Sequence, residues 1–310
     1  MSFRLLRLPD VALREVLKKF NPKETLLLAQ TSLQSSRLIS RHRRYHDIKI
    51  TVVDGDFDSY MHIFYGEREI FRIFIDTRRE DNYNSFWRFK TLVPVRYLRN
   101  TLMSRWTQKV TAFQEILDFL NKIFRIKEVS FEISREPSNW VVLILEHVKA
   151  KNLKIESVEW SEAKENEDIT ERFFMALKGV RYLSIQGFSR FNYYHLLQMD
   201  LLQITGASKM IAENIVALRN CKRVSLVFVW LRAVDMKRIL REYMENLGEL
   251  LELRMKYHIY VELEEVVKGL DVVRIEEEGN HPKYWFTTND GIRFSVTREM
   301  TMIVVIRRET

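Results

Sequence analysis

The sequence predicts an α/β protein in which three short helices precede an antiparallel strand meander and an irregular strand–helix repeat. Apolar residues recur at helical spacing near the start, alternate with polar residues over 48–75, and then recur as a short phrase between 126 and 275. The expected divisions are therefore residues 1–45, 46–105 and 106–310.

The composition is that of a globular chain of 310 residues, with 46% hydrophobic and 30% charged residues. One cysteine excludes an internal disulfide framework. Charges interrupt every apolar run before signal-peptide length, and no run reaches the ~18 apolar residues of a membrane span. We therefore expect a chain of the cytosol or nucleus, with no membrane partner.

The positive charge is concentrated at the start of the chain. The net charge is +8, and residues 1–47 hold ten Lys and Arg against four Asp and Glu, a net +6. The nearly balanced remainder argues against a nucleic-acid surface spread over the whole molecule. A basic start points to an acidic partner at that place.

The first helix is predicted by apolar residues at positions i, i+3, i+4 and i+7: Leu13, Val16, Leu17 and Phe20. Pro9 suits its first turn, where a missing N–H breaks no hydrogen bond.

The second helix is predicted by its start, because Asn21 can cap it, Pro22 fits its first position and Glu24 can complete a capping box. It is apolar on all sides at 26–29, and a third helix is expected over about 32–44. About forty residues cannot bury so many leucines, so the surplus must pack on the rest of the chain or on a partner.

This pattern resembles an F-box, and is similar to F-box proteins of a nematode-expanded family that carry an F-box-associated domain of type 2. The resemblance rests on Leu8-Pro9, Val16-Leu17, Pro22-Lys23-Glu24, Leu26 to Leu28 and Arg37. It implies docking on the acidic Skp-type adaptor of a cullin–RING ubiquitin ligase, and hence a substrate receptor. The implied adaptor-binding residues are Leu8, Pro9, Leu13, Val16, Leu17, Leu26, Leu27 and Leu33.

An alternative is a nucleic-acid-binding or scaffold protein whose basic segment at 41–44 grips phosphates. Phosphate binding needs no run of leucines at 26–28, whereas adaptor docking does, so nucleic acid is the less favoured partner.

After Asp47, alternating residues predict a three-stranded antiparallel meander over 48–53, 60–65 and 70–75. A long connection is expected over 77–105, and an amphipathic helix over 110–123.

The phrase apolar-x-x-apolar-x-apolar then occurs seven times, at intervals of 19 to 29 residues. The copies begin at Ile126, Ile155, Val180, Met199, Cys221, Leu250 and Leu270. Helix-like segments lie between several of them, at 140–148, 169–177, 211–218 and 234–247.

This spacing is typical of leucine-rich repeats, although the Asn ladder of such repeats is missing. Any α/β layer with a mostly parallel sheet is the alternative. Strands near 284–286, 292–296 and 302–306 should form an antiparallel cap.

The phrase also predicts a target-binding surface, because Leu183 and Ile185 should point inward while alternate residues point outward. The residues expected to meet a protein target are Ser184, Gln186, Gln203 and Ser225. We expect this surface to be mostly uncharged, which favours a protein target over nucleic acid.

No motif for phosphate binding, metal binding or nucleophilic catalysis is present. Cys221 occupies an apolar position of the repeat, which predicts a buried thiol. His42 and His46 are expected at a solvated helix end. We therefore expect no catalytic residue, no cofactor and no metal.

Overall fold

The computed structural model describes residues 8–41, 46–55, 58–77, 83–134, 139–161, 167–187, 193–278 and 281–309. The chain divides into two compact units. The first comprises 1–132 and 139–156, and the second 133–138 and 157–310. These two units do not divide at 45 or at 105. The first helices belong to the first unit, where α2 packs beside β3 and α3 beside α4.

The first unit begins with α1 (Asp10–Leu17), α2 (Pro22–Thr31) and α3 (Leu33–Arg41). Strands β1 (Asp47–Asp54), β2 (Ser59–Tyr65) and β3 (Arg68–Asp76) pair antiparallel in that order, which confirms the predicted meander. Their alternating side chains explain the pairing, since Ile50, Ile63 and Phe71 fall on the buried face and are at most 1% exposed.

The segment 77–105 is not the expected connection. It contains β4 (Ser85–Arg88), β5 (Leu92–Leu98) and β6 (Thr101–Arg105). β6 pairs parallel with β3, and β5 joins it to β4. Many of its side chains are charged, and its strands are short, so neither alternation nor length distinguished it from a loop.

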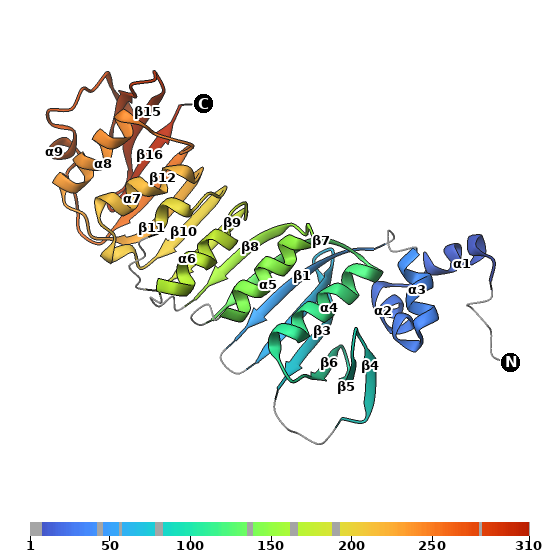
Figure 1. Cartoon of the computed structure of the whole chain (residues 1–310). Helices are drawn as coiled ribbons and strands as arrows, with labels where there is room; N and C mark the ends of the chain where they lie inside the picture. Colours follow the sequence, from blue (N-terminus) through green and yellow to red (C-terminus); the bar gives the residue numbers. More distant parts are fainter. Residues whose placement is uncertain are drawn as a thin grey trace. The chain divides into compact units, whose positions relative to one another are not determined.

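The rest of the first unit is α4 (Lys109–Ile123), β7 (Arg125–Ile133), α5 (Asn139–Ala150) and the start of β8 (Ile155–Trp160). Its strand order is β7-β1-β2-β3-β6-β5-β4. In Figure 1, α4 and α5 lie across one face of these strands. The predicted amphipathic helix at 110–123 is confirmed as α4.

The second unit alternates strands and helices before an antiparallel end (Figure 1). Its alternating part contains α6 (Glu167–Ala176), β9 (Tyr182–Gln186), η3 (Tyr194–Leu196), β10 (Leu201–Thr205), η4 (Ala207–Lys209), α7 (Ala212–Ala217), η5 (Leu218–Asn220), β11 (Arg223–Val229), α8 (Ala233–Glu245), β12 (Glu252–Tyr257) and α9 (Leu263–Val267). The end contains β13 (Arg274–Glu278), β14 (His281–Thr287), β15 (Arg293–Met300) and β16 (Ile303–Arg308).

The repeated phrase places five parallel strands, β8 to β12, in one register. Its middle positions align directly, with Leu202 opposite both Leu183 and Val224, and Val224 opposite Leu253. These side chains are at most 2% exposed. Because each strand buries the same apolar pair, neighbouring units complete one continuous core.

The prediction that the seventh copy of the phrase forms another strand of the repeat is wrong. β13 pairs antiparallel with β14 and continues no parallel ladder. Val273 and Ile275 are 64% and 60% exposed. The apolar triplet therefore occurs here without the burial that it marks on the parallel strands. The predicted antiparallel end is confirmed, because β14, β15 and β16 pair in succession and β16 joins β12.

Candidate protein-interaction site

The start of α2 is built as the sequence predicts. The Asn21 Oδ1 accepts a hydrogen bond from the Glu24 backbone N–H at 2.9 Å, and Glu24 Oε2 accepts one from the Asn21 N–H at 2.8 Å. Pro22 occupies the first helical position. This capping box satisfies two backbone donors that a helix start leaves free, and so sets where α2 begins.

The apolar residues of α1 to α3 divide between the interior and the surface. Leu13, Leu17 and Leu26 are between 1% and 4% exposed. Leu27 is 38% exposed and Leu33 48%. Of the other residues predicted for adaptor binding, Pro9 is exposed and Leu8 and Val16 are half-buried.

Val11, which the sequence reasoning did not single out, is 75% exposed on α1. It follows Asp10 at the helix start and does not belong to the apolar stripe of the first helix, so the periodicity did not indicate it. Like Leu27 and Leu33, it is a large apolar side chain that the chain itself leaves exposed, so it is available to a partner.

The buried side of these helices is held by the strand-rich part of the first unit. α2 packs beside β3, and α3 beside α4. The Lys23 Nζ donates to Asn100 Oδ1 at 2.6 Å, and the Arg88 backbone N–H donates to Gln30 Oε1 at 2.8 Å. The surplus leucines thus divide, some packing on the chain and some remaining exposed.

His46 corrects the expectation of a solvated helix end. Its side chain is 8% exposed and its ring contacts those of Tyr65 and Phe124, with centroids 5.7 and 6.4 Å away. Burial lowers the pKa of His46 below its ordinary value, because a charged ring is disfavoured there. Residues 42–45, which include His42 and most of the basic segment, lie outside the described residues.

A comparison with protein-family models matches the F-box domain at residues 5–47. Residues 5–47 are an F-box domain. Such a domain implies, in general, a substrate-recognition role in an SCF (Skp–cullin–F-box) ubiquitin ligase, binding its Skp-type adaptor. F-box proteins are typically non-catalytic subunits of these ligases.

No curated protein and no solved structure matches the chain. Among the described residues, no helix combines the length and the apolar character that crossing a membrane requires.

Outside the F-box, the predicted target-binding residues lie on β9, β10 and β11. Gln186 is exposed, and Gln203 and Ser225 are half-buried. Ser184 is only 3% exposed, so the expectation that it lies on the surface is wrong. The inward register of Leu183 is nevertheless right, since that side chain is fully buried.

The burial of Ser184 follows from its neighbours. In the parallel ladder it lies directly between Glu159 and Gln203, whose side chains are longer. Tyr182, on the same strand, donates its hydroxyl to Gln203 Oε1 at 3.3 Å. A serine side chain between such neighbours is covered although it points away from Leu183.

The sequence predicted that this strand face is mostly uncharged, and that prediction is wrong. Ser184, Gln203 and Ser225 lie side by side on neighbouring strands of this face. The same row continues to Glu159 on β8 at one end and to Arg254 on β12 at the other. Arg254 is paired with Glu299, and Arg307 with Glu252 at 3.0 Å. The face therefore has a polar centre flanked by charges.

Cys221 is a buried thiol, as its repeat position predicts. Its side chain is fully buried, and the Sγ donates to the Leu197 carbonyl at 3.4 Å. Burial raises the pKa of Cys221 to about 12. A thiol that stays protonated at neutral pH is a poor nucleophile.

The ends of β11 and β12 carry exposed aromatic residues that the sequence reasoning missed. Trp230 is 58% exposed and its ring stacks on His258, with centroids 5.2 Å apart. Phe228, 45% exposed, has a φ of 65° where the register of β11 shifts. A bulky side chain rarely adopts this conformation, and such strain often marks binding sites. The run of aromatics directly after an apolar phrase was the available signal.

Proposed function

We propose that this chain is the substrate receptor of an SCF ubiquitin ligase, bridging a Skp-type adaptor to a protein target. The F-box match at residues 5–47 carries the proposal. The exposed Leu27 and Leu33 support it, because adaptor docking requires apolar side chains that the chain itself does not cover.

The finer assignment is a member of the nematode-expanded F-box family with a C-terminal F-box-associated domain of type 2, acting in the cytosol or nucleus. The strand–helix repeat, similar in spacing to leucine-rich repeats, would hold the target. Candidate contacts are Gln186, Gln203 and Ser225 on the strand face, and the loops around Trp230. Ubiquitin transfer is performed by other ligase subunits, and the receptor raises the target's effective concentration beside them.

Adaptor binding is tested by a Leu27→Glu/Leu33→Glu variant, in a co-purification with a co-expressed Skp-type adaptor. Both side chains are exposed, so the variant should fold. Burying one leucine contributes about 1.5–3 kcal/mol, and a buried charge costs more. We therefore expect the adaptor affinity to fall by more than about a hundredfold.

The matched control is Leu143→Glu on α5, a leucine that is also 38% exposed but lies outside the F-box. It should leave the adaptor affinity unchanged. A folded double variant that binds the adaptor at full strength would contradict the proposal. Leu17→Glu is unsuitable for this test, because Leu17 is only 4% exposed and its replacement would destabilise the fold.

A further inference from the structure

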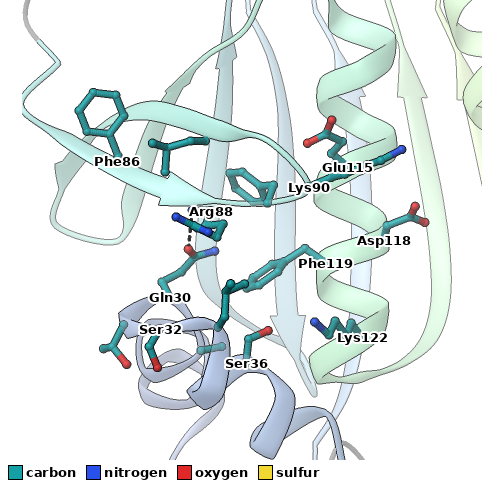
Figure 2. A pocket seen from close by; sticks show the side chains of 15 residues that line it. Gln30, Ser32, Ser36, Phe86, Arg88, Lys90, Glu115, Asp118, Phe119 and Lys122 are labelled. Carbon is teal, nitrogen blue, oxygen red and sulfur yellow. Dashed lines mark hydrogen bonds between the residues drawn. The ribbon is translucent and has the colours of Figure 1, made fainter.

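The first unit contains a cavity of about 630 Å³ between the F-box helices and the strands that follow them. Figure 2 shows its walls, with Gln30 of α2, Ser36 of α3 and Ser32 between these helices on one side. Phe86 and Arg88 of β4 form the second wall, and α4 the third. A volume of this size is in the range of sites that hold a small ligand or a short peptide segment.

The cavity offers apolar contacts that are open to solvent. Phe86 is 62% exposed, Leu92 57% and Leu33 48%. Deeper in the wall, Phe89 and Phe119 are 8% and 7% exposed, with ring centroids 5.5 Å apart. An apolar side chain of a ligand would displace water from all of these surfaces.

The acidic side chains that line the cavity already have partners. Glu115 Oε2 accepts hydrogen bonds from the Thr91 N–H at 2.8 Å and from the Thr91 hydroxyl at 2.9 Å. The Asp118 Oδ1 lies 3.0 Å from His147 Nε2 and 2.9 Å from Lys151 Nζ. These carboxylates are therefore engaged within the protein.

The basic side chains of the same cavity are different. Arg88, Lys90 and Lys122 are exposed, and none has an ion-pair partner among the described residues. The lining thus carries three cations against two carboxylates, Glu115 and Asp118, so its net charge is positive. Carboxylates of a ligand would meet charge-assisted donors there.

Gln30 adds an unused donor. Its Oε1 accepts from the Arg88 backbone N–H, which orients the amide (Figure 2). Its Nε2 is buried and has no hydrogen-bond partner. A buried N–H₂ group without an acceptor costs free energy.

We propose that this cavity binds an acidic segment of the protein target, with an apolar side chain against Phe86 and Leu92 and carboxylates facing Arg88, Lys90 and Lys122. Nine of the fifteen residues that line the cavity lie outside the F-box, on β4, on β5, on the turn between them and on α4. A partner read by these residues is specific to this chain, which favours the target over an adaptor shared by F-box domains. The assignment of the segment to a target rests on the proposed function, but the acidic binding site does not.

The test is fluorescence anisotropy of the full chain with a fluorescein-labelled peptide that alternates Glu and Leu. Two control peptides replace every Glu by Gln, or every Leu by Ser. We expect the acidic peptide to bind at least about tenfold tighter than either control, and its affinity to fall as salt rises. Equal affinity for the acidic peptide and its Gln control would overturn the proposal.

Matched variants locate the site. The Arg88→Glu/Lys122→Glu variant should lower the affinity for the acidic peptide by at least about tenfold. Lys127→Glu should leave this affinity unchanged, because Lys127 is an exposed lysine on β7 outside the cavity. Leu92→Ala should weaken peptide binding more than Leu98→Ala, which is 47% exposed on the same strand but does not line the cavity. If circular dichroism shows that the charge-reversed variant is folded and the variant binds the acidic peptide with wild-type affinity, the peptide binds elsewhere. That result would refute the proposed site.

Adaptor co-purification separates the two proposals. The charge-reversed variant should retain the Skp-type adaptor; loss of the adaptor together with the peptide would mean that the cavity serves the adaptor, and would overturn the assignment to a target. If wild-type chain binds the acidic peptide but no adaptor, the proposed function fails and the acidic site stands.

Discussion

The F-box helices and the strands β8 to β12 use leucine in opposite ways. In the strands, Leu183, Leu202 and Leu253 are completely buried, because each strand lies between two neighbours and under a helix layer. In the F-box, Leu26 is buried but the adjacent Leu27 is 38% exposed. A short helix that is apolar on all sides remains partly exposed when the rest of the chain packs against one side of it only.

This difference shows how leucines that stabilise the fold can be distinguished from leucines that bind a partner. A leucine covered on both sides holds the fold, and replacing it changes the free energy of unfolding. A leucine covered on one side only is available to a partner. Substitutions chosen by exposure can therefore test each role separately.

The largest expected effect is on the strand core. Leu202→Arg should unfold the second unit or destabilise it by more than about 4 kcal/mol, because an unpaired charge replaces a fully buried side chain. Leu201→Arg, at the adjacent position and 39% exposed, should change the stability by less than about 1 kcal/mol. Urea unfolding followed by circular dichroism measures both. Equal stability of the two variants would show that the inward register is wrong.

A second prediction concerns alkaline pH. The folded pKa of Cys221 is about 12 and the ordinary value 9.0, so the unfolded chain loses this proton first as the pH rises. The thiol's contribution is therefore complete below about pH 9 and declines toward pH 12, by up to about 1.4 kcal/mol per pH unit. Burial raises the pKa values of Tyr243 and Tyr257 as well, which acts in the same direction.

Cys221→Ser isolates the thiol, since a serine does not titrate in this range. Between pH 9 and 12, urea unfolding of this variant should show a shallower loss of stability than wild type. At pH 7 we expect a cost of about 1–3 kcal/mol from the buried hydroxyl, and unchanged ubiquitin transfer in a reconstituted ligase. Loss of transfer in a folded variant would instead assign Cys221 a catalytic role.

The smallest effect is expected at the start of α2. Asn21→Ala removes a capping box and should destabilise the first unit by about 1 kcal/mol. The control is Gln108→Ala, because Gln108 precedes α4 without a side-chain cap hydrogen bond, and it should cost less. Thermal unfolding compares them. An equal shift of both midpoints would mean that the cap does not set the stability of the F-box.

Local patterns in the sequence determined where most helices and strands begin. The capping box at Asn21, the alternation of β1 to β3, and the apolar phrase on β8 to β12 all depend on residues close together in the chain. The same patterns indicated the F-box and the buried Cys221. Spacing along the chain suffices for these features because a helix or strand has a fixed period.

Only the tertiary structure decided which of these residues a partner can reach. Ser184 is covered by Glu159 and Gln203 from other strands, and Leu27 and Leu26 differ only in what packs against each. The cavity beside the F-box joins residues of α2 to a hairpin and a helix more than fifty positions later. Exposure and unpaired charge depend on neighbours distant in sequence, and no local period encodes those neighbours.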